Sequence, residues 1–119
     1  MAKRTYQMDR VFHALGDTTR LSVVEMLTRG PMSVSDLARS FEMALPSFTQ
    51  HLSVLETCGL IRSHKSGRVR TYYLDAKCLK SAERWVDEQR RVAKKKQGRV
   101  DAYLLAIKSS EPPVSGGRS

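Results

Sequence analysis

The sequence lacks most of the features that mark a membrane protein or a secreted scaffold. No apolar run approaches the ~18–20 residues that a membrane-spanning helix needs. The opening MAKRTYQMDR is charged and has no apolar segment behind it of the kind found in secretory signals. Two cysteines, Cys58 and Cys78, are too few for a disulfide scaffold. We therefore expect a cytoplasmic chain with no membrane partner.

Patterns that would indicate catalysis are also missing. The sequence has no glycine-rich phosphate loop, and no Ser–His–acid or Cys–His set stands in a recognisable context. We therefore expect neither an enzyme nor a bound cofactor.

Acidic residues are scarce relative to basic ones. The 119 residues contain 21 Lys and Arg against 12 Asp and Glu, a formal net charge of +9. Such an excess favours an anionic partner, and nucleic acid is the commonest one for a small basic domain. The alternative is a basic surface that serves solubility alone.

Apolar spacings of three and four residues predict helices, and β-branched and aromatic runs predict two strands. One domain over residues 1–107 is expected, followed by a disordered tail over 108–119, which is rich in Ser, Pro and Gly. Gly98 is expected to kink or end the first part of the last helix. The predicted elements are helices over 5–15 and 18–29, a short helix capped by Ser33 or Ser35, a helix over 46–58, strands over 60–64 and 69–74 around a KSG turn, and a helix from Lys77.

This order, helices followed by a hairpin, predicts a mainly α fold with a β-hairpin wing, the winged helix-turn-helix. In the helix over 46–58, Phe48, Leu52 and Leu55 fall within about 60° of one another at ~100° per residue and form a core face. The other side is uncharged and small, which suits the major groove of DNA better than an ordinary solvated face. The candidate DNA-reading residues are Pro46, Ser47, Thr49, Gln50 and Ser53.

The predicted hairpin carries cations of one sign. Residues 62–70 contain no acid, although polar turns normally mix both charges. Arginine suits phosphate because its fork binds two oxygens. The hairpin is therefore expected to hold the DNA backbone, the alternative being a solvated turn. The candidate phosphate contacts are Arg62, Lys65, Arg68 and Arg70.

Several motifs fall in order between Phe12 and Leu74: ALGDTTRL, SVSDLA, LPSFTQHLSVLETCGLI and GRVRTYYL. With them the chain resembles the ArsR/SmtB family of winged-helix transcriptional repressors. The resemblance implies a homodimer that uses its first and last helices as the interface, binds an operator in double-stranded DNA and leaves it on sensing an inducer. Two positions depart from the family pattern: Thr18 stands where Pro is usual, and Ala44 where Ser commonly caps the reading helix.

The metal-ligand patterns of the family are absent. The stretch SVSDLARS has no cysteine, and residues 77–108 have no histidine. Cys58 matches the second of two thiolate positions on the reading helix, but Val54 occupies the first. A metal site is not expected, and the inducer is unidentified. A redox switch that uses Cys58 and Cys78 is the remaining sensor hypothesis, the alternative being two buried apolar thiols.

Other readings stay open at this stage. The basic run at Arg90, Arg91, Lys94–Lys96 and Arg99 is either a second DNA contact or a solvated helix face. A non-specific or architectural nucleic-acid-binding protein would also explain the net charge. A protein-interaction module that merely keeps the fold is a third possibility. His51 is expected on the shoulder of the core.

Overall fold

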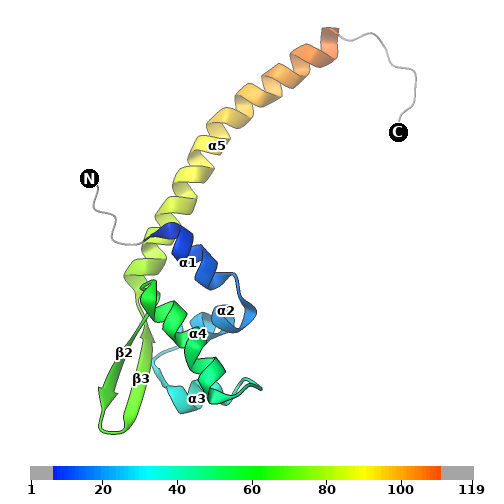
Figure 1. The fold of residues 1–119 in the computed structure, drawn as a ribbon. Helices are drawn as coiled ribbons and strands as arrows, with labels where there is room; N and C mark the ends of the chain where they lie inside the picture. The colour runs from blue at the N-terminus through cyan, green and yellow to red at the C-terminus, as the bar shows by residue number, and fades with distance from the viewer. Residues whose placement is uncertain (1–6, 111–119) are drawn as a thin grey trace. The chain divides into compact units, whose positions relative to one another are not determined.

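The computed structural model describes residues 7–110, and within them the expected helices and wing are present (Figure 1). The chain therefore has the predicted winged helix-turn-helix architecture, mainly α with a β-hairpin. The helices are α1 (Met8–Leu15), α2 (Thr18–Leu27), α3 (Val34–Ala38), α4 (Leu45–Thr57) and α5 (Ala76–Ser110), and the strands are β1 (Met32–Ser33), β2 (Ile61–Ser66) and β3 (Val69–Leu74).

Side-chain caps set the starts of the early helices. Asp17 accepts a hydrogen bond from the backbone N–H of Arg20 at 3.0 Å and caps α2, as predicted. Ser33, rather than Ser35, caps α3 by accepting from the N–H of Asp36 at 3.1 Å. Ala44 precedes α4 and supplies no side-chain cap. The first turn of α4 therefore lacks the side-chain hydrogen bond that caps α2 and α3.

The three strands form a sheet in the order β1–β3–β2. Lys65 pairs with Arg70 and Ser66 with Val69, so the turn consists of Gly67 and Arg68 instead of the predicted KSG. Gly67 has φ +62°, the left-handed backbone that a tight hairpin turn requires. The sequence did not predict β1, because two residues show no alternation.

The core lies where α1, α2, α3 and α4 meet the sheet and the start of α5. Phe48, Leu52 and Leu55 of α4 are fully buried, which confirms the predicted core face. Phe48 stacks on Phe41 with ring centroids 5.1 Å apart. The remaining fully buried apolar side chains include Val11, Val23, Leu37, Leu60, Ile61 and Cys78.

Contacts divide the chain into two compact units, one ending at Glu83 and the next beginning at Arg84. The helix α5 continues through Gly98 without a break, so this glycine does not end it. It also runs to Ser110, three residues into the segment expected to be tail; residues 111–119, like residues 5 and 6 of the first predicted helix, lie outside the described part. Within residues 7–110, no helix is both long and apolar enough to cross a bilayer.

Asp75 joins the wing to the start of α5. Its side chain is only 9% exposed and accepts a hydrogen bond from Arg62 Nε at 2.8 Å. Its other oxygen accepts from the backbone N–H of Lys77 at 3.0 Å, which caps α5. One carboxylate therefore holds the base of the hairpin and the first turn of the last helix.

Replacing Asp75 with alanine should lower the free energy of unfolding by about 2 kcal/mol, because both a cap and a partly buried ion pair are lost. The measurement is urea denaturation. The matched control is Asp87→Ala, which removes an exposed pair with Arg90 (3.2 Å) and should change stability by less than about 0.5 kcal/mol. Equal effects of the two substitutions would contradict this role of Asp75.

Candidate nucleic-acid interface

The outer side of α4 carries the predicted reading residues. Pro46, Ser47, Thr49, Gln50 and Ser53 are all exposed. Thr49 Oγ1 donates to the Pro46 carbonyl at 3.1 Å, so this hydroxyl offers mainly its acceptor capacity. The side chains of these five residues are therefore accessible from outside the domain.

The wing lies against one flank of α4. Ser63 Oγ in β2 donates to Glu56 Oε2 at 2.9 Å, and Arg70 Nη1 in β3 donates to Ser63 Oγ at 2.8 Å. Glu56 lies seven residues after Thr49, two turns further along the same side of the helix. Thr49 and Arg70 of the wing are therefore on the same side of α4.

Lys65 and Arg70 face each other across the hairpin. They form a directly opposed pair in the antiparallel register, on the face that also carries Ser63. Like charges at such a position destabilise a sheet. Neither Lys65 nor Arg68 at the turn has an ion-pair partner within residues 7–110. An anion bound here would remove the repulsion.

Arg62 is separated from the other three cations of the wing. It lies at the base of the hairpin, on the opposite strand face from Lys65, and pairs with Asp75. Its side chain is still 59% exposed. Its observed contact is nevertheless structural, so the sequence-based grouping of all four cations combined two different environments.

Arg20 is a structural residue that the sequence analysis did not assign. Its Nε donates to the Ala14 carbonyl at 2.8 Å, at the C-terminus of α1, and its Nη1 lies 3.1 Å from His51 Nδ1 in α4. His51 Nδ1 is also 3.6 Å from Asp17 Oδ2. The backbone N–H of Arg20 holds the pKa of Asp17 below its usual value. Arg20 thus ties α1, α2 and the half-buried His51 of α4 together.

The two cysteines are neighbours in an apolar environment. Cys78 is fully buried and its Sγ lies 4.0 Å from the carbonyl of Cys58, whose own thiol donates to the Leu55 carbonyl at 3.4 Å. Burial raises the pKa of both thiols, that of Cys78 to about 11. Because the thiolate is the reactive form, this environment does not favour redox chemistry. The described part of the chain contains no group of three or more His, Cys, Asp or Glu that could hold a metal ion.

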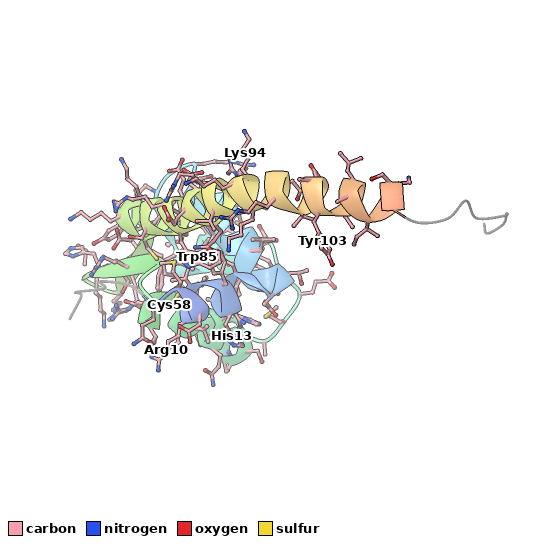
Figure 2. All side chains as sticks on the ribbon, turned by 90° about the horizontal axis from the view of Figure 1, so that it is seen from above. Arg10, His13, Cys58, Trp85, Lys94 and Tyr103 are labelled. Carbon is pink, nitrogen blue, oxygen red and sulfur yellow. The ribbon has the colours of Figure 1, made fainter. Side chains whose placement is uncertain are left out.

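The basic run of α5 is only partly free of acidic partners. Arg90 pairs with Asp87 at 3.2 Å, and Arg91 pairs with Glu88 at 2.6 Å. Lys94–Lys96 and Arg99 have no acid at the neighbouring helical positions. Lys94 and Tyr103 leave the helix on opposite sides (Figure 2). The ion pairs of Arg90 and Arg91 therefore favour the solvated-face interpretation for these two residues.

A helix whose exposed side is uncharged from Leu45 to Ser53, with a basic wing beside it, is typical of a DNA-binding regulator of the winged helix-turn-helix class. Residues 17–63 match the family described as bacterial regulatory protein, arsR family. The chain belongs to this family.

Curated relatives support this assignment. The transcriptional regulator Rv2034 of Mycobacterium tuberculosis is 43% identical over 67 residues, which are 56% of this chain and 63% of that protein. The transcriptional repressor SdpR of Bacillus subtilis is 32% identical over 79 residues, 66% of this chain and 88% of that protein. The match therefore spans slightly under two thirds of Rv2034 and most of SdpR.

Solved structures agree with the fold. A crystal structure of the ArsR family transcriptional regulator RHA00566 is 45% identical, with a TM-score of 0.72 over 79% of this chain and 97% of that chain. The DNA-binding domain of Mb0332 from Mycobacterium bovis, described as homodimeric, is 24% identical with a TM-score of 0.56 over 69% of this chain and 80% of that chain. At that identity the second comparison shows the fold alone.

Iodoacetamide at pH 7 should label the native protein slowly, and Cys78 should react only after unfolding in urea. A thiol with a pKa of about 11 is roughly 300-fold less ionised at this pH than an ordinary cysteine of pKa ~8.5. Mass spectrometry of Cys58→Ser and Cys78→Ser variants separates the two sites. Rapid labelling of native Cys78, or a Cys58–Cys78 disulfide formed with mild oxidant, would instead favour the redox switch.

Proposed function

We propose that this protein is a dimeric repressor that binds a near-palindromic operator, reads bases with the outer side of α4 and holds phosphates with the wing. The observation that carries the proposal is the opposed Lys65–Arg70 pair, which lies on the same side of α4 as Thr49. The repressor role of SdpR and the regulatory role of Rv2034 support it.

Phosphate binding explains a charge arrangement that folding alone disfavours. Lys65, Arg68 and Arg70 bring three cations to one end of the hairpin, and none of them has an acidic partner within the described residues. Each phosphate that they neutralise releases a counterion, so affinity for DNA falls steeply as salt increases. Arg62 contributes chiefly through its contact with Asp75.

Self-association through α5 would give the protein two copies of the reading helix. Apolar residues recur at every seventh position in the second part of α5, at Val86, Ala93, Val100 and Ile107, and the first three are exposed. A two-fold dimer would place two copies of α4 on half-sites about one helical turn, ~34 Å, apart. Because the partner is chromosomal DNA, we expect the protein in the cytoplasm.

A non-specific or architectural role is the competing proposal, since it also needs a basic surface. A DNase footprint on the DNA upstream of the gene distinguishes the two. A protected near-palindrome supports the repressor, whereas uniform coverage supports the architectural role.

Arg68→Ala should weaken binding to all DNA sequences and reduce the slope of log K against log salt by about 0.9 for each protomer, or about 1.8 for the dimer, because each wing loses one phosphate contact. Ser53→Ala should instead relax base preference at one position by about 1 kcal/mol and leave the salt slope unchanged. Both effects are measurable by fluorescence anisotropy at several salt concentrations.

The matched control is Arg91→Ala, because Glu88 already neutralises this arginine at 2.6 Å. It should leave both affinity and salt slope unchanged. If Arg68→Ala and Arg70→Ala behave like this control, the wing does not contact DNA and the proposed function fails.

A further inference from the structure

A hollow of about 420 Å³ lies between α1 and α4. Pockets for small ligands typically measure about 300–1,000 Å³, so it has room for a small organic molecule. Arg10, His13 and Cys58 are labelled in Figure 2. The described residues that line the hollow include Arg10 and His13 of α1, Gln50, Ser53 and Val54 of α4, and Cys58 directly after α4.

The inner wall of the hollow is apolar. Val54 and Cys58 are half-buried and pack against the hydrophobic core. The Cys58 thiol donates to the Leu55 carbonyl of its own helix at 3.4 Å, and burial raises its pKa. This thiol is therefore neutral and behaves as a soft apolar surface.

The rim of the hollow is cationic. Arg10 is exposed, and its guanidinium has no ion-pair or hydrogen-bond partner within residues 7–110. None of the described residues that line the hollow is acidic. Asp9 is adjacent to Arg10 in sequence, but consecutive residues do not face each other on a helix. An arginine fork binds a carboxylate through two oxygens.

We propose that this hollow binds a small organic carboxylate, with its apolar body against Val54 and Cys58 and its carboxylate on Arg10. The hydroxyl of Ser53 and the amide of Gln50 supply further polar contacts at the edge. A neutral or cationic molecule of the same shape binds more weakly, because it leaves Arg10 without a partner.

Occupancy of the hollow interferes with DNA reading, and this consequence rests on the proposed function. Gln50 and Ser53 line the hollow and also belong to the predicted reading residues of α4. A ligand that engages them competes with base edges for the same groups. By linkage, the ligand lowers operator affinity by the same factor by which DNA lowers ligand affinity. The carboxylate is therefore the inducing signal.

The binding test uses the full chain without DNA. Butyrate, phenylacetate and octanoate are titrated to about 10 mM, a range that detects weak millimolar binding, while ¹H–¹⁵N NMR spectra report on backbone amides. We expect saturable shifts at amides of α1 and α4 for at least one carboxylate. Its amide analogue, such as phenylacetamide, should bind at least about tenfold more weakly, in line with the loss of a charge-assisted contact.

Two variants test the assigned residues. Arg10→Ala should weaken the carboxylate at least about tenfold, whereas Arg29→Ala, a matched exposed arginine outside the lining, should not. Val54→Phe should fill the hollow and abolish binding, and its NMR spectrum shows directly whether the fold is kept. The inference is overturned if none of the three carboxylates binds, or if Arg10→Ala and Arg29→Ala bind equally well.

Operator affinity is measured separately by anisotropy. A saturating carboxylate should raise the Kd for DNA at least about fivefold in the wild-type chain, and not in Arg10→Ala. If the ligand binds but the Kd is unchanged, the hollow is not the inducer site. If the ligand-free protein fails to bind any DNA, the proposed function fails, while the NMR titration still decides whether the hollow binds a carboxylate.

Discussion

The burial of Phe48, Leu52 and Leu55 sets the rotation of α4 about its own axis, and the surface of the domain depends on that rotation. Once these side chains are inside, Glu56 faces the wing, Thr49 is exposed two turns away on the same side, and Gln50 lines the hollow beside α1. Arg20 also fixes the position of α4, because it connects the C-terminus of α1 to His51 in α4. A turn of the helix by one residue would expose core side chains and bury polar ones.

The partners of individual basic residues indicate their roles better than the net charge of the protein does. Arg20, Arg62 and Arg91 engage carbonyls or carboxylates and hold elements or helix turns in place. Lys65 and Arg68 carry the same charge and have no such partner within residues 7–110. The 21 Lys and Arg residues therefore include some that organise the fold and others that are available to an external anion.

Helical periodicity and turn residues were enough to predict the order of elements, the core face of α4 and the cap by Asp17. Composition could not show that Arg62 is drawn to Asp75, because the two are 13 positions apart and meet only when the hairpin closes. The strand β1 was too short to predict. Gly98 did not end α5, because a single glycine costs only about 1 kcal/mol in a long helix. The contribution of Arg10 and His13 to a hollow likewise depended on how α1 packs on α4.

The two-residue turn of the wing has a consequence for how such proteins could diversify. Each residue of an antiparallel strand advances about 3.4 Å, and successive side chains alternate between faces. Adding one residue to each strand would turn the tip to the opposite face, whereas adding two would preserve orientation and extend it by about 7 Å. In the proposed complex that length equals about two base-pair steps of DNA. In such a complex, each strand of the hairpin could lengthen only by even numbers of residues. The reach of the wing along the duplex would then change in steps of about 7 Å, while the reading helix stays unchanged.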